Sequence, residues 1–229
     1  MDLVPSRQAS RSFDGVSDHV NLGDVLNSKL TGSNPTWTIS TWLKTDSLDD
    51  GVFISKLNSN TNDRQIYFRV LSTGEVAGIV YEGGTSSATR YGRQTSTGGS
   101  ITANTWHHVA ISWDYTSTGS YLRIWIDGVE ATTLTDYFSN GISDGTIFSG
   151  NANVIFGTTD GSSIAHWGGK IADMRIYDTD LTATDISDIY NGTTDRTNLV
   201  GQWLTNSDDV LDHAGTNDGT NNGSTYSTD

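Results

Sequence analysis

Glutamate is rare in this sequence, which limits the hydrolytic chemistry the chain can perform. The glutamates are Glu75, Glu82 and Glu130. Glycoside hydrolysis needs two carboxyl groups on opposite sides of the scissile bond, and one strand face places such a pair most simply. These three are too scattered for that, so only carboxylates assembled from different strands could supply the pair. The histidines and serines form no recognisable nucleophile motif. We therefore predict a non-catalytic protein and rank a glycoside hydrolase last.

Aromatic and arginine side chains alternate with apolar ones in the segments 66–70 and 121–126. This period of two is that of a strand with one face on a core, so the polar and aromatic set shares the opposite face. Sugars contact aromatic rings through their C–H faces and polar side chains through their hydroxyls. We predict a glycan- or protein-binding surface on this face and nearby loops. Its residues are Tyr67, Arg69, Arg90, Tyr91, Tyr121, Arg123, Trp125 and Trp167.

The same alternation has a purely structural interpretation. Exposed aromatics are favoured on sheets, and cross-strand Tyr–Arg pairs stabilise a sheet without any ligand. For any single residue of the predicted surface this interpretation weighs more than a binding role. Both alternatives remain open at the level of sequence.

Short strands must position these residues. The segment 106–134 predicts a meander, because Val109, Ile111 and Trp113 alternate and Asp127-Gly128 is a strong hairpin turn. We expect loops over 23–35 and 136–153. Further strands are expected within 9–22 and at 37–44, 52–56, 64–71, 76–81, 88–94, 154–157, 171–177 and 199–204. One short helix is predicted near 182–190, where Thr182 begins a capping pattern.

Composition narrows the classes of function further. The 229 residues carry a formal net charge of −14, which disfavours nucleic acid and anionic membranes as partners. There are no cysteines, so disulfides and Cys-based zinc sites are excluded. No run of about 20 apolar residues is present to span a bilayer, and no apolar segment of a secretory signal is visible near the N-terminus.

Acidic loops could supply oxygen ligands for calcium, which takes six to eight of them. Such loops occur at 46–50, 178–180 and 208–212. None follows the EF-hand spacing. For any single aspartate, a role as a turn former or solubilising charge weighs more than a role as a metal ligand.

Five ordered motifs resemble the laminin-G-like domains of the concanavalin A-like lectin/glucanase superfamily. They are SFDG at 12–15, WTISTWLK at 37–44, WHHVA at 106–110, RIWIDG at 123–128 and GKIADMRIY at 169–177. The resemblance covers most of residues 12–190. It implies a two-sheet antiparallel jelly-roll sandwich. It also implies a structural calcium ion near the first and last motifs, which nominates Asp14 and Asp173. The paired-carboxylate motif of the glucanases on this fold, Glu-x-Asp-x-Glu, is absent.

A segment near the C-terminus, LVGQW at 199–203 with the Asn/Gly-rich stretch after it, resembles a piece that many relatives carry in front of the SFDG-like strand. Terminal strands of a jelly roll lie close together, so this shift is compatible with the same fold. We expect a flexible arm at 1–11 and one laminin-G-like domain at 12–229.

These observations favour a non-catalytic carbohydrate-binding or adhesion module on a cell or virion surface, including a phage decoration, fibre or tail component. The expected partner is a glycan, a surface polysaccharide or a neighbouring protein subunit. The alternative is a purely structural protein that clamps subunits of a larger assembly. An oligomer is compatible with either function.

Overall fold

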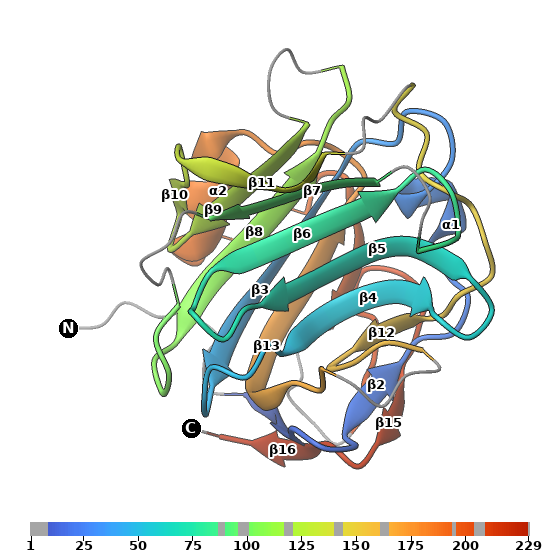
Figure 1. Cartoon of the computed structure of the whole chain (residues 1–229). Coiled ribbons are helices and arrows are strands. Elements are labelled where there is room, and N and C mark those ends of the chain that lie inside the picture. The colour runs from blue at the N-terminus through green and yellow to red at the C-terminus, as the bar shows by residue number, and fades with distance from the viewer. Residues whose placement is uncertain are drawn as a thin grey trace.

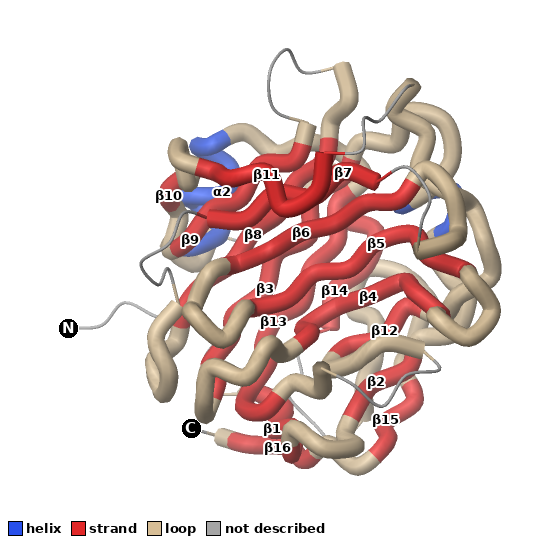
Figure 2. Tube along the Cα trace, viewed as in Figure 1, coloured by secondary structure: helices blue, strands red, loops and turns tan. Residues whose placement is uncertain are grey.

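The computed structural model of the chain is a sandwich of two antiparallel β-sheets packed face to face (Figures 1 and 2). The structure describes residues 9–86, 90–95, 101–116, 121–139, 144–160, 165–193, 196–203 and 209–228. In Figure 1 the sheet that holds β4, β5 and β6 lies in front and the sheet that holds β3, β8 and β13 lies behind it. The predicted two-sheet jelly roll is confirmed.

Sheet A, the rear sheet, has the strand order β10-β9-β8-β3-β13-β1-β16, and β14 also pairs with β13. The strands are β1 (Ser10–Asp14), β3 (Trp37–Thr45), β8 (His107–Trp113), β9 (Leu122–Ile126), β10 (Val129–Glu130), β13 (Gly168–Tyr177), β14 (Leu199–Trp203) and β16 (Thr225–Ser227). The predicted hairpin is present, because β9 and β10 flank Asp127-Gly128. Both turn residues have positive φ, of 52° and 78°, as such a tight turn requires.

Sheet B, the front sheet, has the strand order β11-β7-β6-β5-β4-β12-β2-β15. The strands are β2 (His19–Asn21), β4 (Val52–Asn58), β5 (Asp63–Val70), β6 (Val76–Tyr81), β7 (Arg90–Thr95), β11 (Leu134–Ser139), β12 (Val154–Phe156) and β15 (Thr220–Asn222). Sequential hairpins connect β4, β5, β6 and β7, which places their alternating side chains in register.

The core lies between the sheets and follows the predicted alternation. Ile111 on β8 pairs with Ile39 on one side and Ile124 on the other, and all three are buried. The rings of Trp37 in sheet A and Phe68 in sheet B lie 5.6 Å apart between centroids. Such contacts across the interior hold the two layers together.

Helix α2 (Ala183–Tyr190) covers part of the outer face of sheet A. Its capping box is complete, because the Thr182 hydroxyl accepts the Asp185 N–H and the Asp185 carboxylate accepts the Thr182 N–H. Ile186 and Ile189 are buried against Trp125 of the sheet. The predicted helix is confirmed.

Four elements were not expected from the sequence. Helix α1 (Asn27–Leu30) lies in the expected loop 23–35, and β11 extends into the expected loop 136–153. Strands β15 and β16 belong to the Asn/Gly-rich C-terminal stretch, and every β15 side chain is exposed. Edge strands of this kind show no apolar alternation, because their stability comes from pairing with a neighbour.

The predicted flexible arm at 1–11 is too long. Residues 1–8 lie outside the described part of the chain, but Ser10 and Arg11 belong to β1 and are buried. Arg11 donates from Nε to the Ser224 hydroxyl at 2.9 Å and from Nη2 to the Ser224 carbonyl at 3.0 Å. β16 pairs with β1 in the same place, so the two terminal segments lie side by side as predicted.

Asp212 organises the loop between β14 and β15. Its carboxylate accepts the backbone N–H groups of Gln202, Ala214, Gly215 and Asn217 at 2.9 to 3.1 Å, together with the Asn217 side-chain amide. The pKa of Asp212 is lowered, since these hydrogen bonds outweigh the raising effect of its burial. This carboxylate therefore fixes the C-terminal segment to β14.

Substituting Asp212→Asn should weaken the C-terminal attachment. The charge is lost and an amide N–H₂ replaces an oxygen that accepts N–H donors, so we expect a loss of about 1–3 kcal/mol. The measurement is urea unfolding followed by tryptophan fluorescence. Asp188→Asn, a change at an exposed position of α2, is the control. Equal stability of the two variants would contradict the role given to Asp212.

His108 on β8 is a buried histidine on the outer face of sheet A. Its ring packs against Trp42 at 5.2 Å and Tyr190 at 6.0 Å between centroids. Neither ring nitrogen has a hydrogen-bond partner among the described residues. Burial lowers the pKa of His108 to about 4, and the nearby carboxylates of Asp173 and Asp127 only partly oppose this shift.

Stability should therefore fall as the pH drops from about 6.5 to about 4. In this window the unfolded chain protonates the His108 imidazole and the folded chain does not, at a cost of up to about 3 kcal/mol. In the His108→Met variant the melting temperature should depend less on pH within this window. In His213→Gln, a change at an exposed site, the dependence should stay as in the wild type. An unchanged pH profile in His108→Met would contradict the account.

Candidate functional site

Five polar aromatic and arginine residues gather on the outer face of sheet B, and we refer to them as the tyrosine–arginine face. Its members are Tyr67 and Arg69 of β5, Tyr81 of β6, Arg90 of β7 and Tyr137 of β11. The alternation places them there, because Ile66, Phe68 and Val70 of β5 point into the core. Tyr67, Arg69 and Arg90 were predicted to belong to a binding surface.

Arg69 lies between two tyrosine rings. Its guanidinium carbon is 5.6 Å from the centroid of Tyr67 and 5.3 Å from that of Tyr137. One Nη donates a hydrogen bond to the Tyr137 hydroxyl. Since β11 is three strands away from β5 in the sheet order, Tyr137 reaches across the face to make this contact. The stacked guanidinium is thereby held in one orientation.

An apolar floor underlies these groups. Leu57, Ile79 and Tyr81 form a buried cluster separate from the main core, against which Tyr67 and Tyr137 pack. Burial raises the pKa values of Tyr67 and Tyr81 above the usual value of 10.0, so both phenols keep their proton at neutral pH and can donate it in a hydrogen bond. No helix lies in front of β5 and β6 among the elements drawn in Figure 2.

Two of the predicted residues, Tyr91 and Tyr121, lie in the interior between the two sheets. Tyr91 is on β7, within the strand expected at 88–94, and its ring lies 6.1 Å from that of Trp113 and 5.6 Å from that of Tyr121. Tyr121 in turn packs on Tyr115 at 4.7 Å. Both residues are half-buried along the core, so the prediction that they share the outer face is wrong.

Three further predicted residues are elsewhere in the molecule. Arg123 and Trp125 do lie on the outer face of sheet A, but α2 covers it and Trp125 is fully buried. Arg123 stacks over the Trp125 ring at 5.3 Å and forms an ion pair with Asp180. Trp167 is 1% exposed and packs edge-on against Phe53. The expectation that these tryptophans are exposed is wrong, because each fills space in a core.

The sequence reasoning missed Tyr81 and Tyr137. Tyr81 directly follows Val80, which faces the core, so the period of two places the Tyr81 side chain on the outer face. Tyr137 lies in a segment expected to be a loop, and β11 carries a register irregularity between Asp136 and Phe138. No regular alternation could have identified it.

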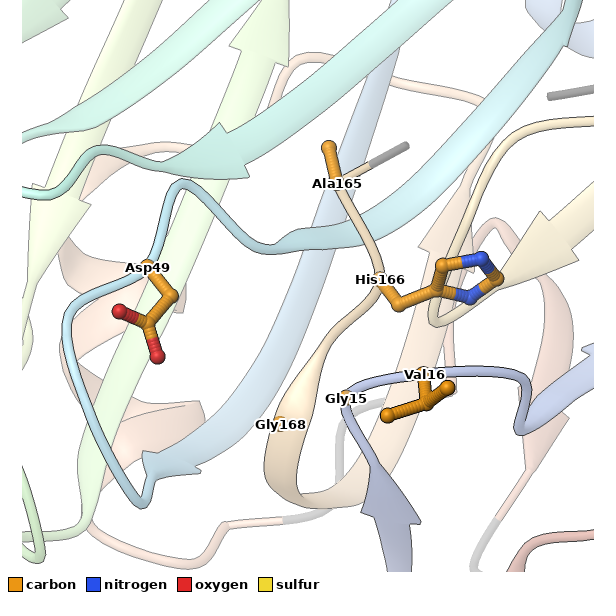
Figure 3. Close-up of a pocket in the computed structure, with 6 residues that line it drawn as sticks. All are labelled: Gly15, Val16, Asp49, Ala165, His166 and Gly168. Atoms are coloured by element: carbon orange, nitrogen blue, oxygen red, sulfur yellow. The ribbon is translucent and has the colours of Figure 1, made fainter. Parts of the chain in front are cut away.

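A second candidate is a rim pocket of about 290 Å³ where three loops meet (Figure 3). It is lined by Gly15, Val16, Asp49, Ala165, His166 and Gly168. Figure 3 shows the His166 ring above Val16, with Asp49 on the far side of the pocket. Val16 is 72% exposed, and burial lowers the pKa of His166. The pocket has no aromatic platform among these lining residues.

The two residues nominated for calcium do not fit a shared ion. Asp14 pairs with Gly168 at one end of β13, and Asp173 is five residues further along, about 17 Å at the rise of a strand. Oδ1 of Asp14 accepts the N–H groups of Val16, Ser17 and Asp18, and these bonds hold the Asp14 pKa well below its usual range.

The surroundings of Asp173 also oppose a cation. Arg175 donates to both of its carboxylate oxygens, at 2.9 and 2.6 Å, and the Gln202 amide donates to Oδ1 at 3.0 Å. Within the described ranges, no group of three or more histidines and acids is placed to hold a metal ion. Asp208, in one of the acidic loops, lies outside those ranges. Calcium binding to this chain remains a prediction without an assigned site.

Calcium should therefore not act through Asp14 or Asp173. We expect any rise in melting temperature, when calcium is added to chelator-stripped protein, to be the same in the wild type and in Asp173→Asn. The physical reason is that the Arg175 guanidinium already neutralises this carboxylate. A calcium-dependent rise present in the wild type and lost in Asp173→Asn would contradict this.

Comparison with known proteins gives the family and the fold. Residues 14–187 match the sequence profile of the concanavalin A-like lectin/glucanases superfamily. No curated protein matches the sequence. Among solved structures, a heptameric pentraxin from Limulus polyphemus superposes with a TM-score of 0.65 at 16% identity, covering 100% of this chain and 97% of that chain.

Two bacterial structures are also similar. A candidate carbohydrate-binding protein from Bacteroides ovatus has a TM-score of 0.65 at 17% identity, and the match covers 96% of this chain and 60% of that chain. The CBM40 module of a Ruminococcus gnavus sialidase, bound to α2,3-sialyllactose, has a TM-score of 0.53 at 15% identity, covering 81% of this chain and 98% of that chain. At these identities the likeness shows the fold alone.

Proposed function

We propose that this chain, which belongs to the concanavalin A-like lectin/glucanase superfamily, is a non-catalytic module that binds carbohydrate through its tyrosine–arginine face. The observation that carries the proposal is the Tyr67–Arg69–Tyr137 stack over an apolar floor. Its rings offer faces for sugar C–H groups, and its phenols and guanidinium offer hydrogen-bond donors. The structurally similar CBM40 module, bound to sialyllactose, supports carbohydrate as the ligand class.

The positions of the glutamates support a binding rather than a hydrolytic role. Glu75 and Glu82 flank β6 at its two ends, roughly 24 Å apart at the rise of a strand. Glu130 lies on β10 in the other sheet. Glycosidases hold their two carboxyl groups about 5 to 10 Å apart, so these glutamates do not form such a pair. The described part of the chain also contains no helix long and apolar enough to cross a membrane.

Two finer predictions remain alongside this proposal. A location on a cell or virion surface, including a phage particle, follows from the binding function and not from any contact in the molecule. The alternative function, a structural protein that clamps subunits, would give a stable symmetric oligomer with no glycan affinity. Native mass spectrometry distinguishes it from a glycan-binding monomer.

Removing one ring of the stack should abolish most of the affinity. A glycan microarray identifies the best-binding oligosaccharide, and calorimetry with that compound measures its Kd. We expect Tyr67→Ala to weaken binding about 10- to 100-fold, because stacking of a sugar on an aromatic ring is worth roughly 1–3 kcal/mol by analogy with the stacking of a nucleic-acid base on such a ring. Tyr226→Ala is the matched control, since Tyr226 is an exposed tyrosine on β16 of the other sheet.

The proposal is overturned if no glycan on the array binds, or if Tyr67→Ala binds like the wild type while both remain folded. Tyr137→Phe provides a second variant for the case that Tyr67→Ala unfolds. It removes only the hydroxyl that accepts from Arg69, so the fold should be retained while the guanidinium loses its fixed orientation.

A further inference from the structure

We propose that the tyrosine–arginine face selects saccharides that carry a carboxylate group, the class of uronic and sialic acids, and that Arg69 binds that carboxylate. This inference rests on the proposed carbohydrate-binding function and specifies the ligand of the same site. Four observations on charge, pairing, donors and geometry lead to it.

Positive charge is concentrated on the strands that form this face. The whole chain has 27 acidic and 13 basic residues, Lys and Arg. Strands β4 to β7 and β11 reverse this ratio, with five basic residues, Lys56, Arg64, Arg69, Arg90 and Arg93, against two acids, Asp63 and Asp136. Lys56 is buried and Arg93 lies with Tyr91 on the core side of the sheet. An anionic ligand on the outer face therefore meets positive charge at Arg69 and Arg90, on a protein that otherwise repels it.

Two of these basic side chains form ion pairs with carboxylates, whereas Arg69 forms none with any described carboxylate. Lys56 forms an ion pair with Asp24 at 2.8 Å, and Arg93 forms one with Asp136 at 2.9 Å. For Arg69, no ion pair with any described carboxylate is present, and its described partners are the neutral phenol rings. Its Nε–H is buried with no hydrogen-bond partner among the described residues.

None of the five members of this face carries a carboxylate acceptor, which suits an anion better than a neutral sugar. Sugar hydroxyls both donate and accept, so sites for neutral sugars combine donors with acceptors such as carboxylates. Here Tyr67 and Tyr137 present phenol hydroxyls that can donate, and Arg69 and Arg90 present guanidinium groups. A carboxylate accepts from all of these, and a charge-assisted bond is roughly twice as strong as a neutral one.

The geometry of Arg69 favours a planar, two-oxygen ligand. Rings on two sides hold its guanidinium, so its fork is oriented before the ligand arrives and little rotamer entropy is lost on binding. A planar carboxylate matches that fork with two parallel hydrogen bonds. The sugar ring attached to the carboxylate then lies within reach of Tyr67 or Tyr137.

The test compares acidic saccharides with neutral counterparts of the same skeleton. The probes are trigalacturonic acid and its methyl ester, and sialyllactose and its methyl ester, titrated by calorimetry at low and moderate salt. We expect one acidic probe to bind at least 10-fold more tightly than its neutral counterpart, with an affinity that falls as salt rises. The two pairs separate a uronic from a sialic acid ligand.

Variants assign the effect to Arg69. Arg69→Gln should lose about 10- to 100-fold in affinity for the acidic probe and little for the neutral one. Arg69→Lys should recover part of the loss, because it keeps the charge without the fork. Arg93→Gln is the matched control on the same sheet, since Arg93 already pairs with Asp136. Melting temperatures confirm that the variants are folded.

The possible outcomes distinguish failure of the acid-selectivity inference from failure of the proposed carbohydrate-binding function. Equal affinity for an acid and its ester or neutral counterpart overturns this inference and leaves the carbohydrate-binding function standing. Acid selectivity that survives in folded Arg69→Gln overturns the assignment to Arg69. Binding of no saccharide at all overturns the proposed function and this inference together.

Discussion

Burial of one face of each sheet against the other is the interaction on which the rest of this structure depends. Each large apolar side chain placed there contributes about 1.5–3 kcal/mol, and the period of two then decides which residues are left on the outside. Those outer residues need either a cover or polar partners. The two sheets meet this need differently, and that difference determines where a ligand can bind.

Helix α2 covers part of the outer face of sheet A. Helix α2 lies over Trp125 and Tyr177, and Tyr190 stacks on Trp42, so the large rings there contribute to stability. Sheet B presents tyrosines and arginines instead, whose rings and guanidinium groups shield Leu57 and Ile79. Similar residue types thus serve the core in one sheet and form a polar surface in the other.

The sequence predicts the fold well because strand alternation and the capping box are local signals, as at Ile111 and Thr182. It predicts the site only in part. Tyr67 and Arg69 were found from alternation, whereas Trp125 shows the same pattern on a face that a distant helix covers. Tyr137 contacts Arg69 across 68 residues of sequence, through a strand with irregular register. The helix that covers Trp125 and the tyrosine that contacts Arg69 both come from distant parts of the sequence. Local alternation of side chains therefore could not predict either of them.

The central claim is that ligand binds on the outer face of sheet B and not at the loop rim around His166. Mapping of backbone amide chemical shifts on adding a bound oligosaccharide tests it most directly. The account predicts that the shifted amides cluster on β5, β6, β7 and β11. Shifts confined to residues 14–18, 46–51 and 165–168, the loops around the rim pocket, would contradict it.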